Sequence, residues 1–452
     1  MIGGGIAGIF AAYELSKQKP DLKVAILEKG NNIYDRECPV ISKKIEKCVA
    51  CKPCAIMEGF GGCGSFSDGK YNFTTEFGGW LHDYIGKEET MRLINYVDSV
   101  LVGFGATKKR FSTYTEEAQQ IYKLALQNDL HLLQAEVKHL GTENNLNIMK
   151  AMYNYLKDRV EIRCNEEVTN IEKINDEFTV ELKNGTAKSK YLVLAVGRAG
   201  SEWFSDQCKK LGLNMINNQV DLGVRVELPY KVFQHITDKI YEFKIKYRTK
   251  QFGDIVRSFC VNPKGHVVTE NRSGILTVNG HSYADPLLQS ENTNFALLVS
   301  NKFTLPFANP YKYGNHIASL SNMLGGGVLV QRFGDLIKGR RTNEHRLSQS
   351  FVRPTLNATP GDLSLVLPKR HMDNIIEMIY ALDKIAPGSA NYDTLLYGIE
   401  VKFYSAKPEL NNQLETNIQG LYACGDGAGI TRSLSFASSS AVHVANCLLE
   451  RF

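Results

Sequence analysis

The chain opens with MIGGGIAGIFAAYELSKQKPDLKVAILEK, residues 1–29. It carries a G-x-G-x-x-G pattern made by Gly3, Gly5 and Gly8. The apolar-periodic stretch IFAAYELSK after the glycines predicts a helix, and KVAILEK predicts a short strand. Strand, glycine turn, helix and strand in this order are typical of the first βαβ unit of a dinucleotide-binding fold.

The glycine spacing has a physical reading. Gly3 permits a tight turn, Gly5 lets the backbone approach a pyrophosphate, and Gly8 lets helix and strand pack closely, with the phosphates over the helix N-terminus. Glu28 ends the second strand, where its carboxylate can accept hydrogen bonds from the ribose hydroxyls of an adenosine. An acidic residue at this position favours FAD or NAD over a 2′-phosphate.

The other end of the chain adds to this pattern. In GLYACGDGAGI, a strand leads into Gly425 and Asp426, and a helix is expected from about Ser435. Asp426 can accept from a ribityl hydroxyl, while the helix N-terminus that follows faces the pyrophosphate.

Bulk properties set the class of protein. A length of 452 residues with 43% apolar and 22% charged residues indicates a globular protein of two or three domains. A net charge of +5, without a basic stripe, argues against nucleic acid as a partner. The absence of a long apolar run or a leader pattern predicts a soluble, cytoplasmic chain with no membrane partner.

The predicted organisation is an α/β chain in which a second domain interrupts a Rossmann-type FAD-binding domain. We expect the first part of the FAD-binding domain at 1–205, including a helical segment at 82–158 and a β-meander at 160–196. An inserted mixed α+β substrate or cap domain is expected at 206–395, and the rest of the FAD-binding domain at 396–452.

Several motifs together resemble a known family. The glycine fingerprint with Glu28, the strand YLVLAVGR and the segment GLYACGDGAG resemble the FAD-binding signature of the glutathione-reductase-type flavoproteins. More narrowly, EGFGGCGSFSDGK (58–70) and LLYGIEVKF (395–403) resemble the uncharacterised FAD-dependent, or NAD(FAD)-utilising, dehydrogenases. The resemblance covers essentially the whole chain.

The resemblance implies further cofactor contacts. The backbone of Val168 would face the adenine, Gly197 would lie near the cofactor at the end of its strand, and Asp426 would hold the ribityl chain. The segment from Gly61 to Ser67 would pass close to the pyrophosphate and flavin through Gly61, Gly62, Ser65 and Ser67.

The glycine pattern has two further features, a second G-x-G-x-x-G spacing and a short segment before the first glycine. Gly59, Gly61 and Gly64 repeat the G-x-G-x-x-G spacing, but no apolar strand precedes them and no long helix follows, so we expect no second dinucleotide domain there. The first strand of such a domain usually contributes four or five residues before its glycines. Here only Met1 and Ile2 precede them, so we expect either a start codon further upstream or a shortened strand that holds flavin weakly.

Four cysteines lie within seventeen positions, at Cys38, Cys48, Cys51 and Cys54. This spacing suits thiolate ligands of an iron–sulfur cluster or of zinc. It equally suits a redox-active disulfide pair or plain reduced thiols. The remaining cysteines are isolated and expected to be buried small apolar residues, namely Cys63, Cys164, Cys208, Cys260, Cys424 and Cys447.

Candidates for chemistry fall in the second domain. Flavin chemistry needs positioning groups and a proton carrier, and the polar residues considered are Arg257, His266, Arg332, Arg340, Arg341, Lys369, Arg370 and Tyr397. Arg257, His266 and Tyr397 are the catalytic candidates. Each also has an ordinary structural reading as a surface, turn or core residue.

The leading functional hypothesis is an FAD-dependent oxidoreductase acting on a small organic substrate by flavin hydride transfer. In this reading the substrate enters between the two domains, and the electron donor is NAD(P)H or a redox protein. The alternative is a flavin-plus-cysteine-cluster electron-transfer protein that serves another redox protein. A third hypothesis, a flavin-dependent scaffold or tRNA-modifying protein, is disfavoured by the lack of a basic stripe.

Overall fold

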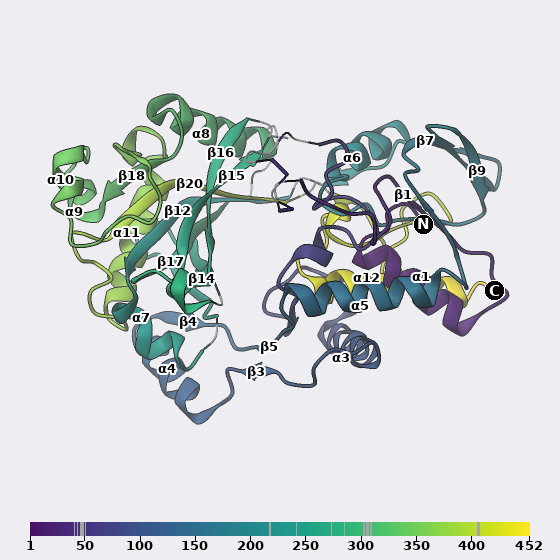
Figure 1. The fold of residues 1–452 in the computed structure, drawn as a ribbon, viewed down its shortest axis with the longest axis horizontal. Coiled ribbons are helices and arrows are strands. Elements are labelled where there is room, and N and C mark those ends of the chain that lie inside the picture. Colours follow the sequence, from purple (N-terminus) through teal and green to yellow (C-terminus); the bar gives the residue numbers. More distant parts are fainter. Residues whose placement is uncertain are drawn as a thin grey trace. The chain divides into compact units, whose positions relative to one another are not determined.

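The computed structural model describes residues 1–39, 41–42, 44–45, 49, 51–216, 218–240, 242–272, 274–283, 285–301, 303, 307, 310–404 and 407–452. The chain divides into two compact units (Figure 1). Unit 1 comprises Met1–Phe111, Ala135–Ile216 and Ser405–Phe452, and unit 2 comprises Ser112–Gln134 and Asn217–Tyr404. Each unit has its own apolar core.

A parallel sheet lies at the centre of unit 1. β1 (Ala25–Glu28) pairs with β6 (Glu161–Cys164), and β10 (Leu192–Leu194) pairs with β22 (Leu421–Ala423). Ile2 joins the two pairs, because it forms parallel bridges to Leu27 on one side and to Leu194 on the other. The order is therefore β6, β1, the segment at Ile2, β10 and β22, as in a Rossmann-type domain.

Two long helices pack beside this sheet and against each other, α1 (Ile6–Gln18) and α12 (Leu434–Leu449). Most of α12 is buried, and its alanine and serine side chains allow close approach to α1. A separate antiparallel meander consists of β7 (Val168–Ile174), β8 (Glu177–Leu182) and β9 (Gly185–Ser189).

The remaining elements of unit 1 surround this frame. They are η1 (Cys63–Phe66), β2 (Lys70–Phe73), α2 (His82–Ile85), α3 (Lys87–Gly103), β5 (Glu136–His139), α5 (Thr142–Leu156), α6 (Ser201–Lys210), β11 (Met215–Ile216), β21 (Lys407–Pro408) and η4 (Asp426–Ala428). The short strand β3 (Phe111–Ser112) spans the division between the units.

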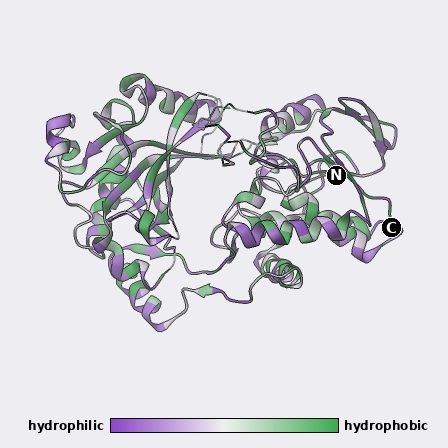
Figure 2. Cartoon of the chain, in the orientation of Figure 1, coloured by the Kyte–Doolittle hydropathy of each residue, from purple (hydrophilic) through white to green (hydrophobic). Residues whose placement is uncertain are grey.

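An eight-stranded sheet forms the body of unit 2, in the order β19-β18-β20-β12-β17-β14-β13-β4. Its pairs are antiparallel except for the parallel β18–β19 pair. The strands are β4 (Leu130–Leu132), β12 (Val220–Pro229), β13 (Ile245–Arg248), β14 (Ile255–Asn262), β17 (Asn292–Asn301), β18 (Leu329–Arg332), β19 (Thr359–Pro360) and β20 (Leu395–Phe403). Hydrophobic and hydrophilic residues alternate along several of them (Figure 2).

A hairpin and several helices complete unit 2. The hairpin is β15 (His266–Arg272) with β16 (Ile275–His281). The helices are α4 (Glu116–Leu126), α7 (Tyr230–Thr237), η2 (Pro286–Leu288), α8 (Pro310–Gly325), α9 (Phe333–Ile337), α10 (Glu344–Ser348), η3 (Leu363–Leu365) and α11 (Lys369–Asp383). None of the helices described here is long and apolar enough to cross a membrane.

The predicted fold class is confirmed: a Rossmann-type parallel sheet with a meander, interrupted by a mixed α+β region. Three segments fall differently from the ranges expected. Residues 396–404 group with unit 2, because β20 pairs with β12 and β18 of that unit. Residues 112–134 group with unit 2, because Ile121 of α4 and Leu130 of β4 join the core of that unit and β4 pairs with β13. The second unit begins after residue 216, because α6 places Phe204 and Cys208 in the core of unit 1.

One buried histidine of unit 2 is expected to make the stability of the chain depend on pH. His371, on α11, is buried, and neither ring nitrogen has a hydrogen-bond partner. Burial lowers its pKa to about 4, and the nearby Asp254 only partly offsets this. The unfolded chain, with a histidine pKa near 6.5, binds this proton more readily than the folded chain between those two values. The stability that His371 contributes is therefore present above about pH 6.5 and lost as the pH falls toward 4.

We expect His371→Leu to flatten this dependence. Between pH 6.5 and pH 5, the variant should lose on the order of 2 kcal/mol less unfolding free energy than the parent chain, at about 1.4 kcal/mol per pH unit for one proton. Urea unfolding at the two pH values measures the difference. His345→Leu, at an exposed position of α10, is the matched control for replacing a histidine by leucine. An equal loss in the parent and His371→Leu chains would contradict the prediction.

Candidate cofactor site and the catalytic candidates

Gly3 and Gly8 sit where a side chain would not fit. Gly3 has φ +102°, and a Cβ there would lie 2.4 Å from the carbonyl oxygen of Ala195. A Cβ on Gly8 would lie 2.0 Å from the carbonyl oxygen of Gly3. The first and third glycines of the pattern therefore allow α1 to start directly against the central strand.

Gly5 is the N-cap residue of α1. Its backbone is extended, and no side chain caps the helix. Gly5 forms a parallel bridge with Gly61, and a Cβ on Gly62 (φ +60°) would lie 3.1 Å from the Gly5 Cα. Gly425 (φ +77°) approaches the same helix, because its Cβ would lie 3.0 Å from the Cβ of Ala7. Glycines from three distant parts of the chain thus meet at the N-terminus of α1.

The carboxylate of Glu28 connects the loop before α1 with both ends of the long connection between β1 and η1. It is buried, and its oxygens accept hydrogen bonds from the backbone N–H groups of Gly4 at 2.7 Å, Gly30 at 2.9 Å and Gly59 at 2.9 Å. The side chain expected to contact a ribose therefore also fixes the loop geometry around it.

Arg36 is a residue of this site that the sequence reasoning missed. Its guanidinium donates to the carbonyls of Ala55, Ile56, Phe60 and Gly62 at 2.7–2.9 Å. Burial lowers the pKa of Arg36 to about 10, with the nearby Glu28 opposing the shift. Its hydrogen-bond partners are all backbone carbonyls, so no sequence pattern predicts them. Arg36 fixes the loop that brings Gly61 and Gly62 to Gly5.

Ser65 and Ser67 lie on and just after η1. The Oγ of Ser65 is buried without a hydrogen-bond partner, and a Cβ on Gly61 would lie 1.8 Å from it. The Oγ of Ser67 donates to the carbonyl of Gly64 at 2.7 Å. Ser65 therefore offers a free polar atom beside the glycine loop, while Ser67 is used in a local turn.

The C-terminal glycine segment places Asp426 beside the end of β10. Gly197 has φ +63°, and a Cβ on Gly427 would lie 2.5 Å from its carbonyl oxygen. The Oδ1 of Asp426 accepts from the Thr431 hydroxyl at 2.7 Å, and its Oδ2 lies 3.4 Å from Nε of Arg198. Val168 is a buried residue that opens the meander opposite Leu182.

The cysteine cluster is described only in part. Cys48 lies outside the described residues, while Cys38, Cys51 and Cys54 are free thiols. Among the residues that the structure describes, no group of three or more histidine, cysteine or acidic side chains is arranged to hold a metal ion.

The isolated cysteines divide into two sets. Cys208, Cys424 and Cys447 are buried as predicted. Cys63, Cys164 and Cys260 are only partly buried, so the prediction was wrong for these three. They lie at η1, at the end of β6 and in β14, and each of these positions is only partly covered by the surrounding chain.

The three catalytic candidates have different environments. Arg257, on β14, donates to Asp221 and to the Tyr404 hydroxyl. Burial lowers its pKa, but these two neighbours outweigh burial and raise it overall. His266, on β15 rather than in the turn considered for it, lies with Nε2 2.9 Å from the carbonyl oxygen of Leu288.

Tyr397 lies in the interior of unit 2. Its hydroxyl donates to Glu227 at 2.6 Å, and both side chains are fully buried. Burial, followed by the proximity of Glu227, raises the Tyr397 pKa well above its ordinary value, and burial also raises the pKa of Glu227. Tyr397 and Arg257 therefore belong to separate hydrogen-bonded groups with different carboxylate partners.

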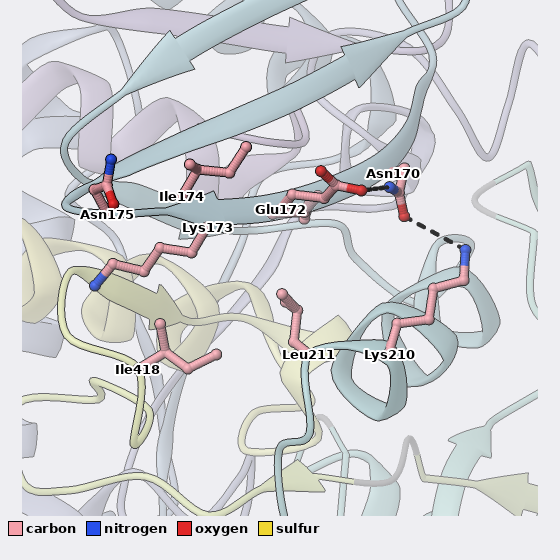
Figure 3. A pocket seen from close by; sticks show the side chains of 9 residues that line it. Asn170, Glu172, Lys173, Ile174, Asn175, Lys210, Leu211 and Ile418 are labelled. Atoms are coloured by element: carbon pink, nitrogen blue, oxygen red, sulfur yellow. Dashed lines mark hydrogen bonds between the residues drawn. The ribbon is translucent and has the colours of Figure 1, made fainter.

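Unit 1 carries an open hollow that none of the three catalytic candidates lines (Figure 3). Lys210 donates to the Asn170 side chain at 3.4 Å, and Asn170 donates to Glu172 at 3.3 Å. The described residues lining it come from the meander, α6 and Ile418, and none is a predicted cofactor residue. The hollow is a surface feature of the meander.

Two family models match parts of the chain. Residues 219–403 match the model described as FAD-dependent protein, C-terminal domain-like. Residues 1–34 match the NAD(P)-binding Rossmann-like domain. The prediction of an FAD-dependent chain is confirmed at the level of this class, while the narrower resemblance to glutathione-reductase-type and NAD(FAD)-utilising proteins stays a prediction.

Among individual proteins, an uncharacterised protein of Clostridium beijerinckii is 26% identical over 471 residues, covering 100% of this chain and 80% of that protein. Solved structures with some likeness include glycine oxidase from Geobacillus kaustophilus, at 13% identity, TM-score 0.38 and 100% and 93% coverage of the two chains. L-Proline dehydrogenase from P. horikoshii has 13% identity, TM-score 0.39 and coverage of 100% and 92%.

Two of the three fingerprint glycines, Gly5 and Gly8, should respond differently to alanine. Gly5 has an ordinary φ of −73°, and its Cβ would meet nothing closer than 4.0 Å, so Gly5→Ala should still fold, with a loss of no more than about 1 kcal/mol from replacing glycine at the N-cap. If the pyrophosphate lies over this residue, the methyl group should weaken FAD binding by about ten-fold or more. Gly8→Ala is the contrast, because its 2.0 Å clash should destabilise the apoprotein by roughly 1–3 kcal/mol.

FAD titration followed by flavin fluorescence, together with urea unfolding of the apoproteins, measures both effects. Parent-like FAD affinity in a folded Gly5→Ala chain would show that the cofactor does not approach Gly5.

Proposed function

We propose that this chain is an FAD-dependent oxidoreductase that acts on a small organic substrate. The observation that carries the proposal is the meeting of Gly5, Gly61, Gly62 and Gly425 at the N-terminus of α1, above a parallel sheet. The match of residues 219–403 to an FAD-dependent protein family supports FAD as the dinucleotide.

The residues present fit the ADP half of FAD. The N-terminus of α1 lacks a side-chain cap, and its backbone dipole favours a pyrophosphate. A carboxylate offers about four acceptor positions, and three backbone N–H groups use the Glu28 carboxylate. One position remains for a ribose hydroxyl. The unpartnered Ser65 hydroxyl gives a further polar group beside the same loop.

The flavin half would be held by the C-terminal glycine segment. Asp426 is oriented by Thr431, and its neighbour Gly427 closely approaches Gly197, which follows β10, so the Asp426 carboxylate can accept from a ribityl hydroxyl. FAD, when bound, supplies two-electron oxidation–reduction chemistry. The chain itself would bind and orient the cofactor through Gly3, Gly5, Gly8, Glu28, Gly61, Gly62, Ser65, Ser67, Val168, Gly197, Gly425 and Asp426.

Arg257 is the stronger substrate-side candidate of the three. Its side chain keeps 14% of its surface exposed, whereas Tyr397 is fully buried against Glu227. A guanidinium held by Asp221 and Tyr404 can orient a polar substrate without changing its own protonation state. NAD(P)H or a redox protein would supply or accept the electrons.

The electron-transfer alternative depends on the spacing of Cys38, Cys48, Cys51 and Cys54. The described residues add no further ligand to that spacing. A metal analysis of the same protein sample therefore tests this role beside the flavin.

We expect protein purified without oxygen to carry about one FAD per chain, identified by chromatography of the released cofactor. Dithionite should bleach its visible flavin bands, and the Gly5→Ala chain is the matched low-affinity control. NADH and NADPH are then tried in turn as reductants, and iron and zinc are measured. A folded chain that fails to bind added FAD would overturn the proposal. Iron in stoichiometric amount would favour the electron-transfer alternative.

A further inference from the structure

One face of the large sheet in unit 2 is lined with charged side chains. Along β12, Asp221, Arg225 and Glu227 point to one face, while Leu222, Val224, Val226 and Leu228 point to the other and join the apolar core. All three charged residues are fully buried. A sheet face that is polar and yet covered is unusual, because buried strands ordinarily present apolar residues on both faces.

The strand register continues this charged face across its neighbours. In one row, Arg225 lies opposite Ala296 of β17, which lies opposite Phe259 of β14. In the next row, Gly223 lies opposite Glu400 of β20. Arg257 and Lys246 pair in the same row on β14 and β13. Asp221 lies opposite Lys402 one row further on. Antiparallel partners share a face, so these charges gather on one surface.

Phe259 is the centre of this charged face. Arg257 lies 5.2 Å from its ring centroid, and the ammonium groups of Lys244 and Lys402 each lie 5.7 Å from it. Three cations, from β14, from β20 and from the residue before β13, therefore surround one aromatic ring. A ring face attracts one cation, but it does not neutralise three.

Carboxylates balance these cations only in part. Glu400 is shared between Arg225 at 3.1 Å and Lys402 at 3.0 Å, and Asp221 is shared between Arg257 and Tyr404. Glu242 lies 3.8 Å from Lys244. Lys244, Arg257 and Lys402 keep 13–17% of their side-chain surface exposed and Glu242 keeps 11%, whereas Arg225, Asp221 and Glu400 keep none. The accessible charge of this face is therefore mainly positive.

The backbone is irregular at the same place. The register of β14 against β17 shifts between Phe259 and Asn262, and Cys260 has φ +50°. The carbonyl of Cys260 accepts from Arg225 at 2.6 Å, so the charged face itself fixes the irregular strand. Bulges and positive-φ residues of this kind gather at binding and active sites.

We propose that the charged face around Phe259 binds the carboxylate of an organic acid substrate through Lys244, Arg257 and Lys402. This proposal rests on the oxidoreductase function proposed above and names its substrate class. Glu400 and Asp221 position two of the three cations. The substrate carboxylate adds a negative charge where the described ion pairs place four cations (Arg225, Lys244, Arg257 and Lys402) beside three carboxylates (Asp221, Glu242 and Glu400).

Calorimetric titration of the FAD-loaded protein with acetate and benzoate tests the proposal, and the uncharged analogues acetamide and benzamide are the control ligands. We expect saturable binding of at least one carboxylate that weakens as salt is added, and none for its amide. Lys402→Met should weaken the binding about ten-fold or more, because Glu400 keeps Arg225 as its partner in this variant. Lys338→Met is the matched control: Lys338 also lies over a ring, that of Tyr392 at 4.8 Å, but is not on this face. Lys244→Met serves as a second variant if Lys402→Met does not fold.

Absence of saturable carboxylate binding, equal binding of the amides, or parent-like affinity in the lysine variants would overturn the proposal. The FAD content and dithionite reduction of the same samples keep the two proposals separate. A protein that holds reducible FAD but binds no carboxylate would lose only the substrate class. A protein without FAD would lose the oxidoreductase function, and the heat of carboxylate binding would still decide the role of this face.

Discussion

The carboxylate of Glu28 is the constraint on which the nucleotide end of unit 1 depends. Loops between strands and helices have backbone N–H groups without ladder partners, and leaving them unpaired in a buried place is costly. Glu28 accepts from Gly4, before α1, and from Gly30 and Gly59, near the two ends of the long connection from β1 to η1. Arg36 performs the complementary task by donating to four carbonyls of that connection. One acid and one base thus satisfy an irregular edge that regular hydrogen bonding cannot.

The different roles of Glu28 and Arg36 explain which of them the sequence could predict. The glycine spacing and Glu28 form a recognisable pattern, because a close backbone approach demands glycine at fixed positions. Arg36 forms no such pattern, since its hydrogen-bond partners are carbonyls that any residue could supply. The segment before the glycines illustrates a related point: Ile2 forms parallel bridges to Leu27 on one side and to Leu194 on the other, and such pairing between distant parts of the chain depends on long-range register.

The charged face of unit 2 did leave a signal in the sequence. In DLGVRVEL, charged residues and glycine alternate with aliphatic ones, which predicts a strand with one polar face. Such a face is normally exposed to water. The burial of this face, and the position of Lys244 and Phe259 on it, depend on long-range register and on the bulge at Cys260. Local spacing reveals neither, so the sequence indicated Arg257 and Tyr397 but not Lys244, Lys402 or Phe259.

The buried ion pair of Arg225 and Glu400 helps to explain the role of this charged face. A fully buried ion pair gains little stability over apolar residues of the same size, because desolvation offsets most of the attraction. Its geometry has a clearer use. Glu400 holds the Lys402 ammonium at 3.0 Å, and Arg225 holds the Cys260 carbonyl at the irregular part of β14. The Arg225–Glu400 pair therefore fixes both the Lys402 ammonium and the strand that carries Phe259. A binding surface needs this kind of support if its side chains are to keep a defined geometry.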